Sequence, residues 1–294
     1  MLCSLTSTSG GPEIFDLVRE LEFEARAALN WIDEYADLQG NGYISYQRRN
    51  EQTGLENQCW KDSWDSIAYH DGRLPGFPRA TCELQGYAYD AKMRGARLAR
   101  LGWDDPEYAD RLEQEAADLK RRFNEDFWVA DGEFFALALD VDGSQVDSLT
   151  SNNGHLLWSG IVDDDKAEIV ARHLLGERLF SGWGIRTMAV GEGRYNPIGY
   201  HVGTVWPFDN SFIAWGLRRY GFKDEAAVVA AGILEAALAP NDARSAPGER
   251  EPGRRCGASV KHWSPRVARH PGPLGKVDAF GRGRVETKWR TGAN

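Results

Sequence analysis

A carboxylate flanked by two indoles is the first feature of this sequence that could do chemistry. Asp62 lies between Trp60 and Trp64, in a run that begins at Gln58 and reads QCWKDS. Apolar aromatic walls raise the pKa of an enclosed carboxyl group, which is what a general acid needs near neutral pH. Either indole could also stack on a glucose ring. The structural alternative is that Asp62 or Ser63 caps a helix and that the tryptophans belong to the core.

The densest group of ring-stacking and hydroxyl-binding side chains runs from residue 195 to residue 210, with the sequence YNPIGYHVGTVWPFDN. We expect a pocket there, lined by Tyr195, Tyr200, His201, Trp206, Asp209 and Asn210. Each of these residues also has a structural interpretation. Asp209 stands near a helix start, where it could be an N-cap, and a lone His201 is more often structural than catalytic. The density of such residues favours the pocket.

Three shorter runs add candidates. Glu83 and Gln85 stand at a helix start, where either could cap the helix or bind hydroxyl groups. Trp183 and Arg186 belong to the run SGWGIRT, and residues 147–160 read DSLTSNNGHLLWSG. By contrast, residues 37–43 lack the alternating acidic residues of a calcium loop, so we interpret them as a turn and predict no metal site.

The composition narrows the class of function. The net charge of −9 argues against a nucleic-acid partner. No apolar run approaches the roughly 18 residues of a membrane span, and we see no secretory signal. Four scattered cysteines without metal-type spacing indicate a reduced, cytoplasmic protein. We predict no cofactor. The 11 Trp, 10 Tyr and 12 Phe fit a large core as well as a sugar-binding surface.

The elements that must position these residues are helices. Periodic apolar residues predict helices from Pro12 to about Ile32 and over residues 83–101, 106–127, 152–159, 163–175, 204–220 and 223–238. A short hairpin is expected at 133–139, with a turn near 142–143. Helices alternate with polar-aromatic loops, which favours an all-α fold, an α/α toroid with its pocket at one end. A solenoid or bundle is the alternative, but no internal repeat period supports a solenoid.

We divide the chain into three parts. Residues 1–11 are expected to be a flexible N-terminus, and residues 12–238 a partial α/α barrel. Residues 239–294 are basic and rich in Gly, Pro and Arg, without a persistent helical or strand pattern. Such a composition is typical of a disordered or non-native tail.

Taken together, five runs resemble the amylo-α-1,6-glucosidase part of glycogen-debranching enzymes. They are also similar to related six-hairpin α/α-barrel glycosidases, including mannosylglycerate and glucosylglycerate hydrolases. The runs begin at Gln58, Gln85, Leu149, Gly182 and Tyr195, in the order of that family. The resemblance covers about residues 12–238.

The resemblance implies an inverting mechanism, in which one carboxylic acid protonates the glycosidic oxygen and a second carboxylate activates water. It makes Asp62 the acid and places Trp60, Arg186, Tyr200, His201, Trp206 and Asp209 in the sugar pocket. The family's base, a Glu in a Leu-Pro-Glu-type stretch, has no match, because the basic tail stands at its place. Glu83 and Glu192 are substitutes that do not match the base position.

From this gap we expect a fragment, with residues 240–294 arising from an out-of-frame reading or a gene fusion. An incomplete ring would expose apolar helix faces and favour self-association. The leading hypothesis for function is hydrolysis of α-1,6 branches in glycogen-like glucans. The alternatives are hydrolysis of a small glucoside such as glucosylglycerate, and a carbohydrate-binding remnant without catalysis.

Overall fold

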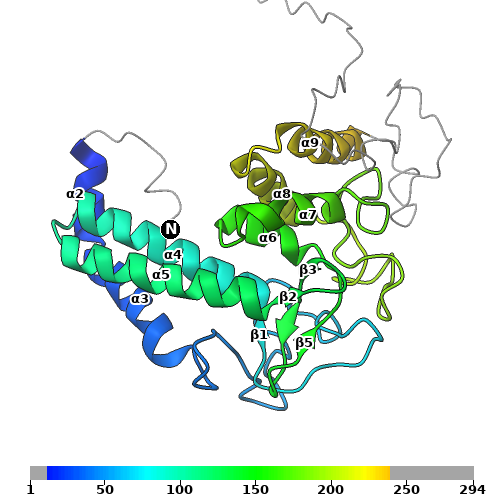
Figure 1. Ribbon diagram of the computed structural model, residues 1–294, viewed down its shortest axis with the longest axis horizontal. Coiled ribbons are helices and arrows are strands. Elements are labelled where there is room, and N and C mark those ends of the chain that lie inside the picture. The colour runs from blue at the N-terminus through cyan, green and yellow to red at the C-terminus, as the bar shows by residue number, and fades with distance from the viewer. Residues whose placement is uncertain (1–11, 239–294) are drawn as a thin grey trace, which may run out of the picture. The chain divides into compact units, whose positions relative to one another are not determined.

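The computed structural model describes residues 12–238, which all belong to one compact unit. The predicted N-terminal segment 1–11 and the tail 239–294 lie outside the described residues. Helices dominate the described part (Figure 1). They are α2 (Pro12–Glu20), α3 (Glu22–Tyr35), α4 (Cys82–Leu101), α5 (Pro106–Asp126), α6 (Asn152–Ser159), α7 (Asp164–Leu174), α8 (Pro207–Arg219) and α9 (Lys223–Leu238).

The helix ends follow local chemistry. The Asp105 carboxylate accepts a hydrogen bond from the Tyr108 amide at 3.0 Å and caps α5, whose first residue is Pro106. Gly160 ends α6 in the left-handed region, at φ 84°. Helix α8 begins later than predicted, at Pro207, because a residue before proline prefers an extended backbone, and Trp206 adopts one.

Two further predictions need correction. The single helix expected from Pro12 to Ile32 is two helices, with a break at Leu21. The single hairpin expected at 133–139 is divided between two small antiparallel sheets. One sheet joins β2 (Trp128–Val129) to β3 (Phe134–Phe135), and the other has the order β1 (Ala80–Thr81), β4 (Ala138–Leu139), β5 (Gln145–Val146). The expected turn is present at Gly143, with φ 82°.

The helices pack as neighbouring pairs. Helices α4 and α5 lie side by side, as do α6 and α8, and α8 and α9 (Figure 1). Glycine allows the closest approach: a Cβ on Gly216 of α8 would lie 2.5 Å from the Trp158 amide nitrogen of α6. Helix α6 is buried along its whole length, which places it at the centre of the packing.

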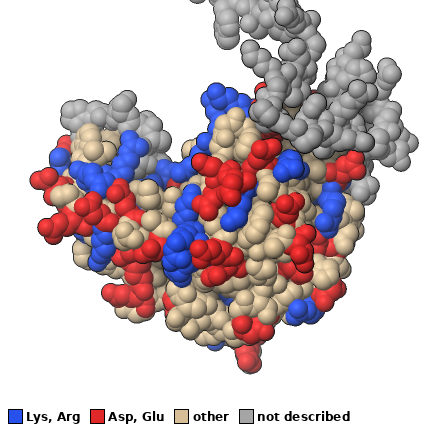
Figure 2. Space-filling view, in the orientation of Figure 1, with Lys and Arg blue, Asp and Glu red and all other residues tan. Residues whose placement is uncertain are grey.

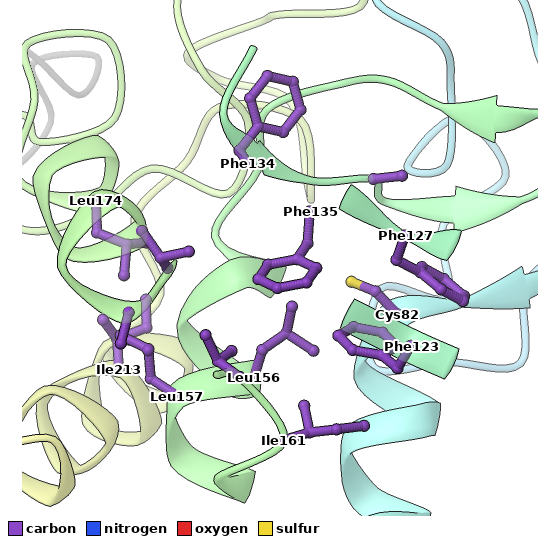
Figure 3. Close-up of a cluster of buried hydrophobic side chains, with 14 of the residues drawn as sticks. Cys82, Phe123, Phe127, Phe134, Phe135, Leu156, Leu157, Ile161, Leu174 and Ile213 are labelled. Carbon is purple, nitrogen blue, oxygen red and sulfur yellow. The ribbon is translucent and has the colours of Figure 1, made fainter. Parts of the chain in front are cut away.

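The main core joins these helices to the small sheets. Phe123 stacks on Phe127 and on Phe135, with ring centroids 4.6 and 5.1 Å apart. Cys82, Leu156 and Ile213 bring α4, α6 and α8 to the same cluster (Figure 3). Within residues 12–238, none of the helices is both long and apolar enough to cross a membrane. Acidic and basic side chains are interspersed over the face shown in Figure 2.

Candidate active site

The loop that carries Asp62 is held by buried polar contacts. The Asn57 side chain, which is fully buried, accepts hydrogen bonds from the Tyr46 hydroxyl at 2.8 Å and from the Arg79 guanidinium at 3.1 Å. Its amide donates to the Ser63 carbonyl at 2.8 Å, and the Ser66 hydroxyl donates to the same carbonyl at 2.8 Å. The Ser66 hydroxyl also donates to the Lys61 carbonyl, so the backbone is held on both sides of Asp62.

Lys61 points in the opposite direction from its neighbour in the chain. Its side chain is fully buried, and its ammonium group donates to the carbonyl oxygen of Thr187. Burial lowers the pKa of Lys61 to about 8, although the negative charges of Asp209 and Glu83 oppose that shift. The motif loop is therefore anchored to the segment before the second aromatic run, 126 residues away.

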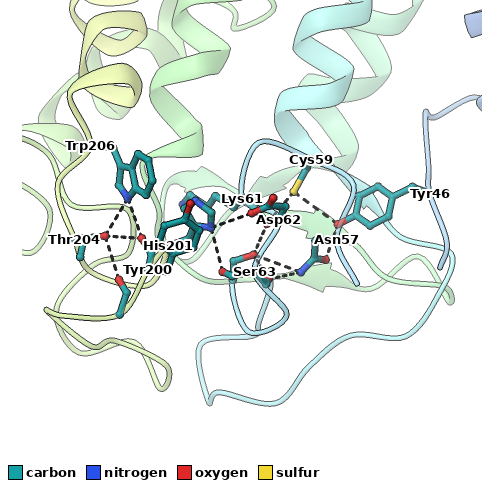
Figure 4. A network of polar contacts seen from close by, with 12 residues as sticks. Tyr46, Asn57, Cys59, Lys61, Asp62, Ser63, Tyr200, His201, Thr204 and Trp206 are labelled. Atoms are coloured by element: carbon teal, nitrogen blue, oxygen red, sulfur yellow. Dashed lines mark hydrogen bonds and ion pairs between the residues drawn. The ribbon is translucent and has the colours of Figure 1, made fainter. Parts of the chain in front are cut away.

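Asp62 faces outward beside His201. Its side chain is 49% exposed, and its carboxylate lies 3.8 Å from Nδ1 of His201. The same nitrogen is 3.1 Å from the Ser63 hydroxyl (Figure 4). Burial lowers the pKa of His201 below its usual value, and the positive charge of Lys61 adds to that effect. The carboxyl group is not enclosed as the sequence suggested, because half of the Asp62 side chain is exposed and Trp64 is itself 58% exposed.

Aromatic rings gather next to this carboxylate. The indole of Trp206 meets the Tyr200 ring edge-on at 5.0 Å and lies 5.2 Å from the His201 ring. Its Nε1 donates to the Tyr200 carbonyl at 2.8 Å (Figure 4). Tyr200 and Phe208 are largely exposed, so flat apolar surfaces remain free beside His201 and Trp60. Aromatic faces of this kind can stack on a sugar ring.

A second layer lies behind the Trp60 indole. Asp209 is fully buried, and its Oδ1 lies 2.7 Å from Nε2 of His155. The His155 ring in turn stacks on Trp60 at 5.4 Å. Trp60 also meets His201 edge-on at 5.4 Å. The structure thus brings Trp60, Asp62, Tyr200, His201, Trp206 and Asp209 into one connected group.

Three sequence candidates are buried away from the exposed carboxylate. The Gln85 side-chain amide bonds both backbone groups of Ile44, and that of Asn210 bonds both backbone groups of Ile185. Their polar atoms hold loops to helices, which is a structural use. Glu83 is fully buried beside Cys82, and its Oε1 has no hydrogen-bond partner among the described residues.

The remaining candidates occupy separate positions. Arg186 is buried, and its guanidinium donates to the Leu179 carbonyl at 3.3 Å. Trp183 is half-buried, with its carbonyl against Gly232 of α9. Tyr195 is half-buried and lies close to Gly203. None of these contacts reaches Asp62 directly.

The sequence interpretation missed several residues that build the site. Lys61 and His155 both stood inside the quoted runs without a role, because residue type alone does not reveal a buried ammonium or a stacked imidazole. Phe208 follows Pro207 in the second aromatic run and could have been found by its neighbours. A cavity of about 410 Å³ lies elsewhere, next to Lys120, Arg219 and Tyr220, and it contains none of the candidates.

Comparison with known proteins places the chain in a family. A family model described as the mannosylglycerate hydrolase MGH1-like glycoside hydrolase domain matches residues 24–250. No curated protein sequence matches the chain.

Solved structures share the fold. The GH63 mannosylglycerate hydrolase from Thermus thermophilus in complex with glucose matches with a TM-score of 0.64 and 18% identity, over 81% of this chain and 64% of that one. The same hydrolase with Tris and D-glycerate gives a TM-score of 0.61 and 16% identity, over 81% and 67%. A structure described as a sialidase gives a TM-score of 0.56 and 16% identity, over 76% of this chain and 20% of that one.

These matches confirm the predicted α/α toroid class. They agree with the mannosylglycerate-hydrolase branch of the resemblance rather than with the debranching branch. The chain spans about two thirds of the length of those hydrolase structures, 64% in one case and 67% in another. The chain belongs to the family of mannosylglycerate hydrolase MGH1-like glycoside hydrolase domains.

Proposed function

We propose that this chain takes part in hydrolysing the glycosidic bond of a small glycoside, with Asp62 as the general acid. The observation that carries the proposal is the difference in burial between two neighbouring side chains of one loop. Lys61 is completely buried and holds the loop, whereas the next side chain, Asp62, is 49% exposed beside His201 and free aromatic faces. A carboxylic acid in that position can reach the oxygen of a bound sugar.

The chemistry requires two carboxyl groups. Asp62 gives its proton to the glycosidic oxygen as the bond from that oxygen to the anomeric carbon breaks. A second carboxylate takes a proton from the water that attacks the anomeric carbon from the opposite face. The result is a free sugar and a free alcohol, with inverted configuration.

Neither substitute suggested by the sequence suits the second role. Glu83 is fully buried. Glu192 is also buried and lies 2.5 Å from the Arg178 guanidinium, and burial raises its pKa. Neither Glu83 nor Glu192 is therefore assigned the second role.

Small glycosides fit better than branched glucans. The family description and the similar Thermus hydrolase both name mannosylglycerate hydrolysis, and structures of that hydrolase hold glucose or D-glycerate. We extend that substrate class to this chain, as a sugar joined to a short polar alcohol such as glycerate. The glycogen-type hypothesis rested on motifs that both branches share, so it becomes the less favoured enzyme activity.

A substrate panel separates the candidate functions. The chain is incubated with mannosylglycerate, glucosylglycerate and a branched limit dextrin, and the free monosaccharide is measured. We expect release from a glycosylglycerate that is lost in Asp62→Asn and kept in Asp110→Asn, which removes an exposed carboxylate of α5.

The other outcomes each point elsewhere. Release from the dextrin alone would favour the debranching activity. Binding of the glycosylglycerates without release, measured by calorimetry, would favour a carbohydrate-binding remnant. If the chain neither binds these glycosides nor releases sugar from them, the sugar hypothesis is overturned.

A further inference from the structure

One imidazole lies at the centre of the layer behind the site. His155 of α6 is fully buried, and its ring is nearly parallel to the Trp60 indole on one face, with an angle of 9° and a separation of 5.4 Å. It is also parallel to the Phe212 ring of α8, at 5° and 5.3 Å. The imidazole therefore stacks on both rings and joins them in one ring stack that includes Trp60.

Both ring nitrogens of His155 are engaged. Nε2 lies 2.7 Å from Asp209 Oδ1 on α8, and Nδ1 contacts the hydroxyl of Tyr87 on α4. A carboxylate oxygen can only accept, so Nε2 donates to Asp209. Burial raises the pKa of the Tyr87 hydroxyl, which keeps it protonated and able to donate to Nδ1. One side chain thus joins α4, α6 and α8.

Trp60 links this junction to the proposed acid. It is separated from Asp62 by one residue, and that residue, Lys61, is itself anchored at Thr187. The charged groups around the junction are Asp209, Glu83 and Lys61, since the negative charges of Asp209 and Glu83 act on both Lys61 and Tyr87.

We propose that His155 is a positioning residue, which holds the Trp60 indole through the ring stack and so places the Asp62 carboxyl group. This inference rests on the proposed function of Asp62. The competing interpretation is that His155 only stabilises the packing of three helices. The two differ in what happens to Trp60 when the protein stays folded.

The experiment uses the mildest change to the junction and a matched control. Tyr87→Phe removes the hydroxyl that contacts Nδ1. Tyr220→Phe removes a hydroxyl that donates to the Val162 carbonyl at 2.7 Å, remote from the stack. His155→Phe keeps a flat ring without its hydrogen bonds, and His155→Gln keeps hydrogen-bonding groups without the ring.

Two readouts are needed. The first is the indole N–H resonance of Trp60 among the 11 Trp signals of the full chain, assigned with Trp60→Phe. The second is the rate of sugar release at saturating glycosylglycerate, with KM measured separately. A misplacement of about 1 Å can cost about 100-fold in rate.

We expect Tyr87→Phe and His155→Gln to shift the Trp60 resonance and to lower kcat by about 10- to 100-fold, with a smaller change in KM. His155→Phe should retain more of the Trp60 signal than His155→Gln, because it retains the stack. Tyr220→Phe should leave both readouts as in the unchanged chain.

An unmoved Trp60 resonance in folded Tyr87→Phe and His155→Gln would overturn the inference. So would a loss of kcat no larger than in Tyr220→Phe. If one His155 variant fails to fold, Tyr87→Phe still tests whether the junction at His155 positions Trp60. If the unchanged chain releases no sugar, the proposed function fails, while the resonance still shows whether His155 holds Trp60.

Discussion

Lys61 carries an ammonium group that is fully removed from water, close to the carboxylates of Glu83 and Asp209. A charge in such a place is costly unless opposite charges and hydrogen bonds compensate for the lost hydration. Here a carbonyl oxygen and two acidic residues compensate in part, and the pKa of Lys61 falls to about 8. The charge of this residue is therefore linked to stability in the alkaline range.

The pH dependence of stability follows from that pKa. Below pH 8 Lys61 is protonated in both the folded and the unfolded chain. Between about pH 8 and the ordinary value of 10.5, only the unfolded chain keeps the proton. The free energy of unfolding should therefore rise with pH in this window, by at most about 1.4 kcal/mol per pH unit.

Lys61→Met tests this linkage. The variant lacks the titrating group, so its unfolding free energy should rise less between pH 8 and 10.5 than that of the unchanged chain. Denaturant unfolding at several pH values measures both slopes, and the Tyr and Cys residues that titrate in the same range are common to both proteins. Equal slopes would show that Lys61 does not change its protonation on folding.

At the residue scale, the sequence predicted which kinds of side chain lie near Asp62 better than it predicted what each side chain bonds. Asp62, His201 and Trp206 meet as the two aromatic runs suggested. Gln85 and Asn210 instead bond backbone groups, because an amide has both a donor and an acceptor and can close a loop onto a helix. Side-chain type does not distinguish these two uses, and only the position of the partner does.

At the scale of elements, periodicity predicted most helices to within a few residues. The clearest error was the single helix predicted from Pro12 to Ile32, which is two helices with a break at Leu21. Helix α8 also begins three residues later than predicted, because the proline at its first turn determines the start and the apolar pattern does not. The strands were harder to predict, because each is two residues long and no alternation can develop over that length. Their pairing depends on contacts between residues far apart in sequence.

The close contact of α6 and α8 gives a prediction at this scale. Gly216→Ala adds a Cβ 2.5 Å from the Trp158 amide nitrogen, and backbone atoms cannot move aside cheaply. We expect a loss of about 1–3 kcal/mol in the free energy of unfolding. Because α6 carries His155, the Trp60 resonance should shift as well.

The matched control lies on the same helix. Ser211→Ala changes an exposed side chain of α8 that donates only to the Phe208 carbonyl, so its effect should stay within about 0.5 kcal/mol. Equal stabilities of Gly216→Ala and Ser211→Ala in thermal or denaturant unfolding would show that α6 and α8 are not in such close contact.

At the scale of the molecule, the chain corresponds to part of its structural relatives. It spans 64% of the Thermus hydrolase that binds glucose. Helix α9 leaves Leu234 and Leu238 exposed, at 65% and 84%. The sequence motifs predicted the wider glycosidase family but favoured its debranching branch, because the pocket runs are shared by both branches.

The central claim concerns one proton, which Asp62 donates to the departing alcohol. A substrate whose leaving group needs no proton isolates that step. The glycosyl fluoride of the preferred sugar, in the same anomeric form as the glycosylglycerate, provides it, since fluoride leaves as an anion. Azide in the assay supplies a nucleophile that needs no general base, so the second carboxylate does not limit the comparison.

The decisive measurement is the rate of Asp62→Asn relative to the unchanged chain on these two substrates, with Asp110→Asn as the control. General acid catalysis contributes about 10²- to 10⁴-fold, so we predict a loss of that size on the glycosylglycerate. On the fluoride the loss should be far smaller. Equal losses on both substrates, or full activity of Asp62→Asn on the glycosylglycerate, would contradict the role of Asp62 as the acid.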